Sequence, residues 1–588
     1  MLLAALALAA SCTKTDPWGN VPGQNQEQNQ TDDPSGGDDV NPGTSDVDVD
    51  DETTSDDNIA NTTFDGTISI TFSESGATVS GSVDGVSVEK SGARVTVTNS
   101  GSNCVTYVLS GSSSDGCFKL YSSKKQAIKL SGLNLVNSRG SAINNQSKKR
   151  TFVVLEGSNT LGDGSVDSDG NYADETSDED MKAAFFSEGQ LIFSGSGSLS
   201  VTAVGKAGIT SDDYVRFMTG PSVSVNSSKG HGVRGKDAII VSGGTVGVTL
   251  GSGATGKKCF TTDSLIFISG GVTTLSNAAS AGTVDGELTG AACIKADQKF
   301  VMQAGTLNLT ATGKGCKGIN CDADGFFEGG TLTAKVTGAN YGSSNGWGSS
   351  SNSVSSKGLK FDGSLSFSGC DLVVSSSSHE AIEAKSAISI SGGTISATSG
   401  DDAINSGSTM TISGGVVYAY STGNDGLDSN GNLYIKDGTV YAIGKGSPEV
   451  GIDANTEQRY KFYLQGGNVI AIGGVESGSS VSQAVISTSW TRSTTYSLCD
   501  GDEVLFSFKA PASGGTTLFM SAPSLESGSS YSLVKGPELS GAATYFDGTI
   551  SLGGTVSGGT STSVKASAYS SSSSGGGGGV GGGGGGRW

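Results

Sequence analysis

Residues 401–415 read DDAINSGSTMTISGG, and residues 379–393 read HEAIEAKSAISISGG. The two stretches match in form, with Ile404 in the place of Ile382. If this apolar residue is position zero, apolar residues recur at +6 and +8 and glycine at +11. Side chains two residues apart lie on the same face of a strand, so the +6/+8 pair predicts a β-strand.

The same pattern recurs along much of the chain, and successive zero positions in its later part are 22 to 25 residues apart. A further run of alternating apolar residues follows the glycine. Three short strands and three turns in about 23 residues predict an all-β fold, a parallel β-helix of about 12 coils in which each coil pairs with the next. The zero positions in this part are Leu359, Ile382, Ile404, Leu427 and Ile452.

The composition supports many short strands joined by tight turns, since 93 of the 588 residues are glycine and only 35% are hydrophobic. Strand-like alternation on both sides of the repeat predicts β-rich caps, which cover the open edges of the stack. We therefore expect a lipoprotein-like signal (1–12), an acidic disordered tether (13–60), an N-terminal β cap (61–130), the β-helix (131–475), a C-terminal β subdomain (476–565) and a Gly/Ser-rich tail (566–588).

The formal charge of −21 comes mainly from two acidic stretches, residues 32–57 and 163–180. Such a balance excludes nucleic acid as a partner, because phosphate binding needs a basic face. The opening MLLAALALAASC resembles the end of a bacterial lipoprotein signal, with Cys12 as the lipidated residue. We expect export to the outer membrane or cell surface, attachment to the membrane through this lipid alone, and a monomer; the alternative is a clipped secretory signal and a secreted protein.

The other eight cysteines form no CxxC pair, and the chain has only two histidines, His231 and His379. This composition argues against a zinc site. We interpret the cysteines mainly as small buried side chains, and Cys104 with Cys117 is the favoured pair if a disulfide forms.

Several segments carry a resemblance to a known family: VTVTNSGSNCVTYVLSG, LSGLNLVNSRGSAI, NYADETSDEDMKAAFFSEGQLIFSGSGSLSV, HGVRGKDAIIVSGGTV, GDDAINSGSTMTISGG, and SGSSYSLVKG followed by GTISLGGTVSGGT. In this order they resemble the bacterial extracellular carbohydrate-binding β-helix proteins related to a calcium-containing binder of cellulose and polygalacturonate. The likeness spans roughly residues 90–560. It implies a right-handed β-helix, calcium and glycan binding.

Two columns of the repeat change from basic to acidic between the coils of Leu359 and Ile382. Like positions stack in a β-helix, so carboxylates in one column repel unless a cation or a turn hydrogen bond compensates them. Two sets of aspartates are candidate calcium ligands, since this hard cation takes several oxygen ligands. They are Asp402, Asp425 and Asp428 in the columns, and Asp167, Asp169 and Asp174 in the loop DSDGNYADE.

Sugar binding needs an exposed aromatic face beside hydrogen-bonding groups. Tyr418 and Tyr441 are predicted to point outward in adjacent coils, with Tyr420 beside Tyr418, and Trp347 lies in an inserted loop. The alternative for the tyrosines is a structural stack between coils. Basic residues of the two columns could meet the carboxylates of an acidic polysaccharide: Arg234, Lys258, Lys295, Lys317, Lys357 and Lys360.

The sequence favours a polysaccharide-binding protein with calcium as cofactor over an enzyme, and we assign no catalytic residue. With two histidines, a Ser-His-Asp or Cys-His site has no support. The main alternative is a calcium-dependent polysaccharide lyase with Lys357 or Lys360 as base. A glycosidase using Asp402 and Asp425, or a surface adhesin or structural rod, are the others.

Overall fold

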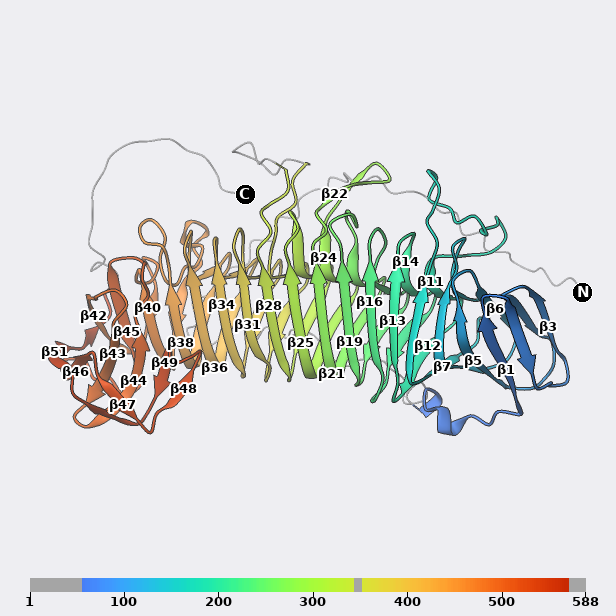
Figure 1. The fold of residues 1–588 in the computed structure, drawn as a ribbon. Helices are drawn as coiled ribbons and strands as arrows, with labels where there is room; N and C mark the ends of the chain where they lie inside the picture. The colour runs from blue at the N-terminus through green and yellow to red at the C-terminus, as the bar shows by residue number, and fades with distance from the viewer. Residues whose placement is uncertain (1–54, 343–351, 571–588) are drawn as a thin grey trace, which may run out of the picture. The chain divides into compact units, whose positions relative to one another are not determined.

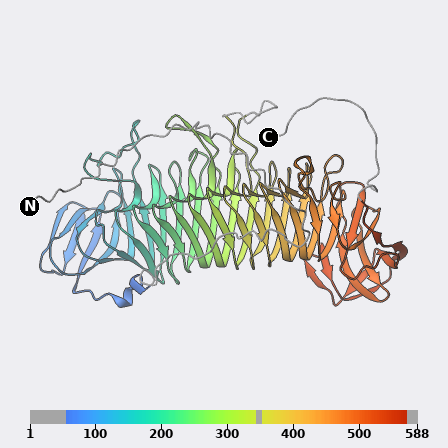
Figure 2. The same cartoon turned by 180° about the vertical axis from the view of Figure 1, so that it is seen from behind.

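The computed structural model describes residues 55–342 and 352–570, which belong to one compact unit. Their regular structure is β-strand apart from two 3₁₀ helices, η1 (Ile59–Asn61) and η2 (Thr456–Gln458). Among these residues, no helix is long and apolar enough to cross a membrane. The strands stack as a β-solenoid, so the predicted all-β parallel β-helix is confirmed (Figures 1 and 2).

One ladder of the solenoid contains the strand that starts each repeat. Ile404 pairs with Ile382 on one side and with Leu427 on the other, as the repeat predicts. All pairs after β4 are parallel. The strands are β4 (Arg94–Asn99), β6 (Cys117–Ser122), β8 (Ile143–Asn145), β11 (Ala183–Ser187), β14 (Ala207–Ser211), β17 (Val233–Gly235), β20 (Lys258–Thr262), β24 (Ala291–Ala296), β26 (Cys316–Cys321), β29 (Leu359–Phe361), β32 (Ile382–Ala384), β35 (Ile404–Ser406) and β37 (Leu427–Ser429).

Two further ladders carry the +6/+8 residues and the run after the repeat glycine. In several coils one long strand bends at the glycine and serves both ladders, as β36 (Met410–Ser421) and β38 (Leu433–Ile443) do. The others are β5 (Val105–Ser113), β7 (Gln126–Val136), β9 (Thr151–Glu156), β10 (Ser158–Gly162), β12 (Leu191–Gly195), β13 (Ser198–Ala203), β15 (Tyr214–Phe217), β16 (Ser222–Ser227), β18 (Ala238–Val241), β19 (Thr245–Leu250), β21 (Leu265–Asn277), β25 (Lys299–Ala311), β27 (Asp324–Phe327), β28 (Thr331–Val336), β30 (Leu365–Phe367), β31 (Asp371–Ser376), β33 (Ile388–Ile390), β34 (Thr394–Ser399), β39 (Phe462–Leu464), β40 (Asn468–Ile472) and β41 (Ser480–Val481).

The repeat residues form the core, as their spacing predicts. Ile404, Met410 and Ile412 are fully buried between the ladders. Gly415 turns the chain with φ of 80°, a conformation that favours glycine. A Cβ there would lie 2.8 Å from the carbonyl oxygen of Gly393 in the preceding coil, so the turn also needs the missing side chain.

The solenoid has about 15 turns, more than the repeat predicts. In the first ladder, parallel pairing begins at β4 and β6, where the glycine pattern is absent, and continues through bridges to Ile452 and Val475. In a second ladder it begins still earlier, between β1 (Gly66–Ser73) and β5. Between β10 and β11 the chain forms the acidic loop 163–181. This loop lengthens the coil, so the coil does not show the repeat spacing of about 23 residues. The sequence period therefore identifies only the regular middle of the stack.

Hairpins cover the N-terminal end of the stack. β1 (Gly66–Ser73) pairs antiparallel with β2 (Gly76–Ser80), and β3 (Val86–Ser91) with β4. Before them, residues 55–61 dock on the solenoid, although composition assigns 55–60 to the tether. Their anchor is the buried Asp57, which is 2.8 Å from the Arg150 guanidinium and 3.0 Å from that of Arg216.

The C-terminal end is closed by antiparallel strands. β45 (Thr517–Ser521) pairs antiparallel with β40, the last strand of its ladder, and with β42 (Ala484–Ser489). A separate six-stranded sheet packs beside the last coils, in the order β48-β49-β44-β43-β46-β51. Its strands are β43 (Thr495–Asp500), β44 (Glu503–Lys509), β46 (Ser530–Lys535), β48 (Ala543–Tyr545), β49 (Ile550–Leu552) and β51 (Thr560–Lys565); the short strands β22 (Gly282–Val284) and β23 (Glu287–Thr289), β47 (Glu538–Ser540) and β50 (Thr555–Ser557), and β52 (Ser567–Ala568) complete the set.

Candidate functional site

The charged +1 column stacks as a continuous row across the first ladder. Lys360 pairs in register with Glu383, and Asn405 lies between Glu383 and Asp428. The row therefore changes sign between β29 and β32, as the sequence predicts. Side chains in such a row are neighbours, because adjacent strands are about 4.8 Å apart.

Lys357 lies where the columns change from basic to acidic and forms ion pairs with the first two acidic residues. Its ammonium lies 2.5 Å from the Glu383 carboxylate and 3.1 Å from that of Glu380. Burial opposes its charge, but the two glutamates outweigh this effect and raise the pKa of Lys357. Lys360 pairs with Asp362. Both lysines are held as ion-paired ammonium groups, so neither fits the role of lyase base that the alternative function assigns to them.

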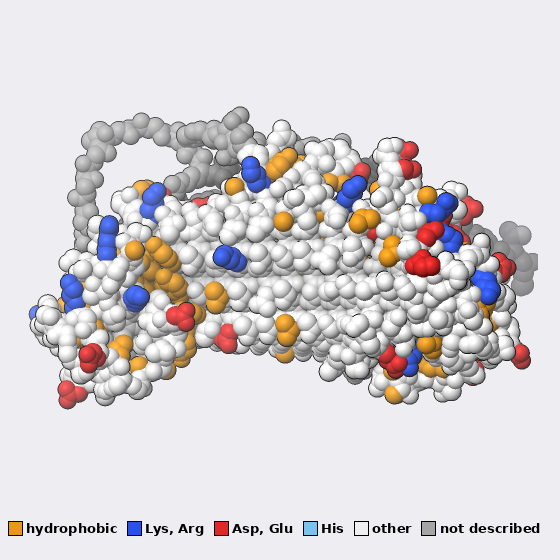
Figure 3. All heavy atoms as spheres, viewed as in Figure 1, with side chains coloured by type: hydrophobic (Ala, Val, Ile, Leu, Met, Phe, Trp, Pro, Cys, Tyr) orange, Lys and Arg blue, Asp and Glu red, His pale blue; other side chains and the backbone are white. Residues whose placement is uncertain are grey.

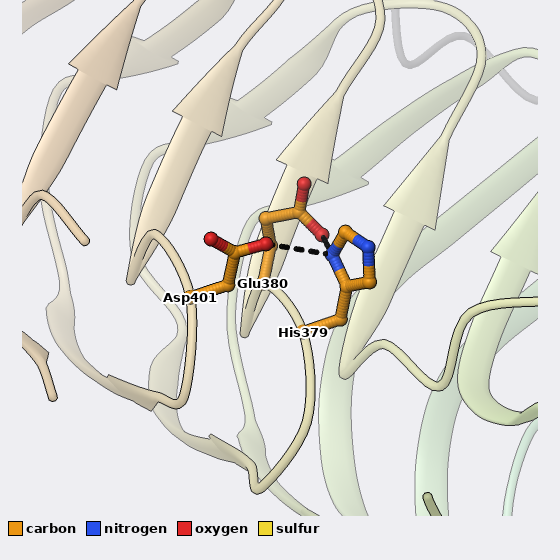
Figure 4. A group of neighbouring side chains, drawn as sticks. All are labelled: His379, Glu380 and Asp401. Carbon is orange, nitrogen blue, oxygen red and sulfur yellow. Dashed lines mark hydrogen bonds and ion pairs between the residues drawn. The ribbon is translucent and has the colours of Figure 1, made fainter. Parts of the chain in front are cut away.

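A histidine joins this cluster from the turn before β32 (Figure 4). His379 Nδ1 contacts the Glu380 carboxylate and lies 3.1 Å from an oxygen of Asp401. Burial opposes ionisation of Glu380, but the hydrogen bond from His379 and the charge of Lys357 lower its pKa to about 2. The negative charge of Glu380 is thus balanced within the protein.

Three acidic positions of the next coils lack such an ion pair. We call Asp402, Asp425 and Asp453 the acid ladder; Asp428 lies beside Asn405 in the +1 row. Asp402 accepts a hydrogen bond from the Asp425 backbone N–H (3.0 Å), and the Asn405 amide donates to Asp402 (3.2 Å) and Asp428 (2.6 Å). Within the described part of the chain, no ion pair joins Asp402, Asp425 or Asp453 to a lysine or arginine.

Burial and mutual repulsion raise the pKa values of the acid ladder. The pKa of Asp402 rises to about 9, first through burial and then through the charge of Asp428. That of Asp425 rises to about 8 through burial and Asp428, and that of Asp453 to about 9 through burial and Glu476. Asp402 and Asp425 are buried and Asp453 is half-buried, so carboxylates at these positions ionise with difficulty and need protons or a cation. Carboxylate oxygens are the donors that Ca²⁺ prefers. The residues of the acid ladder do not bring three ligand atoms within 4.8 Å of one another, so they offer a row of oxygens along the coils instead of a closed cluster.

The second predicted calcium set lies in a loop that has its own counterions. Asp174 pairs with both Arg94 and Arg139, the latter at 2.7 Å. Asp167 accepts hydrogen bonds from the backbone N–H groups of Asp169 and Asn171, a turn geometry. The structure does not bring Asp167, Asp169 and Asp174 together as a cluster with ligand atoms within 4.8 Å of one another. Arginine supplies the positive charge that a cation would bring to Asp174.

The predicted aromatic face is only partly exposed. Tyr418 and Tyr420 lie half-buried on β36, but Tyr441 on β38 is fully buried, so its expected exposure is wrong. The C-terminal sheet covers it: its ring lies 5.4 Å from that of Phe508, and its hydroxyl donates to the Lys509 carbonyl oxygen (3.0 Å). Tyr441 is therefore part of the packing between solenoid and sheet.

The same junction adds two aromatic residues that the repeat does not predict. Phe546, half-buried, lies with its ring 6.0 Å from that of Tyr418, and Tyr545 lies beside Phe546. Phe546 also has φ of 52°, a strained backbone for a bulky residue. We call Tyr418, Tyr420, Tyr545 and Phe546 the junction patch. Figure 3 shows hydrophobic side chains gathered where the C-terminal sheet meets the solenoid.

The predicted basic column divides into paired and unpaired cations. Arg234 pairs with Asp263 (2.9 Å), and Lys295 with Asp322 (2.7 Å). Burial first, and then the charges of other lysines, lower the pKa values of Lys258 and Lys317 to about 8. Two positions on the basic side of the columns therefore lack a counterion among the described residues.

Other predictions concern single residues. Trp347 and Cys12 lie outside the described residues. Cys104 and Cys117 are free, so the expected pairing is wrong. The other six cysteines of the described chain are free and buried, as small apolar side chains would be.

A protein family and a solved structure are similar to this chain. A search of curated proteins found no match. One solved structure, of the polysaccharide lyase-like protein from C. thermocellum (gadolinium derivative), has 19% identity and a TM-score of 0.35, covering 45% of this chain and 96% of that one. The family model of carbohydrate-binding domain-containing proteins matches residues 91–416, more than half of the chain. The chain therefore belongs to the family of carbohydrate-binding domain-containing proteins.

Proposed function

We propose that this protein binds an acidic polysaccharide and that the acid ladder holds Ca²⁺ at or near the contact. The observation that carries the proposal is the row of carboxylates without an ion pair to lysine or arginine, formed by the buried Asp402 and Asp425 and the half-buried Asp453. Asp402 and Asp425 are 5% and 6% exposed, so few water molecules can solvate their charge. A calcium ion there would neutralise the ladder and offer coordination positions to sugar oxygens.

The junction patch suits the apolar faces of sugar rings. Tyr418, Tyr420, Tyr545 and Phe546 are each half-buried, so each keeps part of its surface accessible while packing against the junction. An aromatic face that packing already orders binds a ring with little further loss of side-chain entropy. We include Tyr418 and Tyr420 in the proposed glycan contact and leave Tyr441 out, because it is buried.

The proposal extends to location. The lipoprotein-like sequence before Cys12 supports an exported, lipid-anchored protein, with the acidic segment as a spacer between the lipid and the solenoid. Incorporation of labelled palmitate in a bacterial host, lost in Cys12→Ala, tests the anchor. A secreted protein without lipid would contradict it.

The test of binding is a glycan array probed with the full chain in calcium and in chelator. We expect signals on acidic polysaccharides that calcium strengthens and chelation weakens. The double variant Asp402→Asn/Asp425→Asn should lose this calcium-dependent gain, whereas Asp502→Asn, which removes an exposed carboxylate elsewhere, should keep it. An array without signals in calcium would contradict the proposal and favour a structural rod.

The same samples test the lyase alternative. Incubation with polygalacturonate and calcium should give no growth of unsaturated product in the ultraviolet, because Lys357 and Lys360 are ion-paired. Product that disappears in Lys357→Ala or Lys360→Ala would overturn the assignment of a binding protein.

A further inference from the structure

A surface hollow of about 480 Å³ lies over the turns that precede four consecutive strands of the first ladder, β11, β14, β17 and β20. It lies in the N-terminal half of the solenoid, several coils from the acid ladder. No aspartate or glutamate lines it. The charged or titratable residues that line it, the basic hollow, are Lys182, Lys206, Lys229, His231, Arg234 and Lys257.

The cations of the basic hollow are only partly compensated. Lys182 lies 2.6 Å from both Asp180 and Asp212, Lys206 lies 2.6 Å from Glu175, and Arg234 pairs with Asp263. Lys229 and Lys257 have no ion pair within residues 55–342 and 352–570. The adjoining Lys258 has none there either. The hollow thus gathers positive charge without enough carboxylate to balance it.

His231 adds a neutral hydrogen-bond donor. Its Nδ1 accepts a hydrogen bond from the backbone N–H of Lys258 (3.1 Å). Burial first, and then the charges of Lys258, Lys257 and Arg234, hold its pKa well below the usual range. A neutral ring whose Nδ1 accepts carries its proton on Nε2, so His231 can donate from that nitrogen.

The cations recur with the repeat. Lys182, Lys206 and Lys257 each stand three residues before position zero of their coils, and Lys229 stands four before. Adjacent coils are separated by about 4.8 Å, which is comparable to the length of one sugar unit in a chain. A row of this kind matches a polymer with a charge on successive units better than it matches a single small ion.

We propose that the basic hollow is a calcium-independent subsite for oxyanions carried by a polysaccharide, either carboxylates or sulfate esters. Lys229, Lys257 and Arg234 supply the charge, and His231 Nε2–H donates a hydrogen bond. The inference rests on the proposed glycan binding and adds a second contact that the acid ladder does not provide. Hydrogen bonds from lysine or arginine to a charged oxyanion are stronger than those between neutral groups.

The experiment is affinity electrophoresis of the full chain in chelator, in gels that contain polygalacturonate, dextran sulfate or neutral dextran. We expect retardation by one or both polyanions and none by dextran. Lys229→Ala/Lys257→Ala should weaken it about tenfold or more. The matched control, Lys314→Ala/Lys335→Ala, removes two exposed lysines outside the hollow and should leave retardation within about twofold of the wild type.

Equal retardation of the hollow variant and the wild type overturns the subsite, and so does an equal loss in both double variants, which would show unspecific attraction. If the hollow variant and the wild type are retarded equally, and only when calcium is present, the acid-ladder proposal survives and this one fails. If the wild type is retarded by no polysaccharide with or without calcium, both fail. The polyanion that retards the protein identifies the oxyanion.

Discussion

Replacing Lys357 with methionine tests whether its ammonium group stabilises the boundary where the columns change from basic to acidic. Lys357 is 8% exposed and Glu383 is 1% exposed, and their charged atoms lie 2.5 Å apart. With an effective dielectric constant of about 20, the attraction at this distance is about 7 kcal/mol before the cost of desolvation. Removing one partner of a buried pair costs about 3–5 kcal/mol, because the other charge stays buried.

The remaining partners place the expected loss at the lower end. Glu383 keeps its contact with Lys385, and Glu380 keeps His379. We therefore expect Lys357→Met to lower the free energy of unfolding by about 3 kcal/mol. The conservative control is Lys360→Met, which removes an ion pair whose acid, Asp362, is 42% exposed in its side chain, and should cost at most about 1 kcal/mol.

The assay combines urea unfolding with hydrogen exchange. Because a solenoid can open coil by coil, exchange of the amides in β29 and β32 reports the local loss directly. Adding Glu383→Gln to Lys357→Met should restore part of the stability, since it removes the stranded charge. Equal losses in Lys357→Met and Lys360→Met, or no recovery in the double variant, would refute the reasoning.

Three further predictions concern the acid ladder, the repeat glycine and the C-terminal sheet. In chelator, the melting temperature should fall as the pH rises from about 4 towards 9. The folded pKa values of the ladder, about 8 to 9, lie above the unfolded value of about 4, so the folded state retains protons that the unfolded state releases. Calcium should flatten this slope, and a flat profile in chelator would contradict the prediction. Gly415→Ala should lower the free energy of unfolding in urea by about 1–3 kcal/mol. The loss should exceed that of Gly132→Ala, where φ is 67° but no atom lies within 4 Å of the new Cβ, and equal losses would contradict the close contact. Tyr441→Phe should cost about 1 kcal/mol by losing its bond to the Lys509 carbonyl, and exchange in β44 should rise; unchanged exchange would contradict the contact.

The regular part of the fold is predictable because its period is a physical requirement. Each coil must place residues such as Ile404 and Met410 inside and a glycine such as Gly415 at the tight turn, and the +1 row follows once the coils are aligned. The repeat does not predict the first coils of the solenoid, because their tight turns lack the +11 glycine and a long loop interrupts the spacing.

The candidate site is less predictable because its partners come from outside the repeat. The burial of Tyr441 depends on β44, more than sixty residues later, and Asp174 meets Arg94 across 80 residues. The sequence marks the basic hollow by lysines three residues before position zero. These lysines become neighbours only when the coils stack, so their spacing in the sequence alone does not predict a shared site.

The acid ladder is the centre of this account, and its charge state can be measured directly. Isothermal titration of Ca²⁺ into chelator-treated full chain at neutral pH should show saturable binding with release of protons, since Asp402 and Asp425 have raised pKa values. Asp402→Asn/Asp425→Asn should abolish that binding while Asp502→Asn retains it. The absence of calcium binding in the wild type, or its persistence in the double variant, would contradict the account.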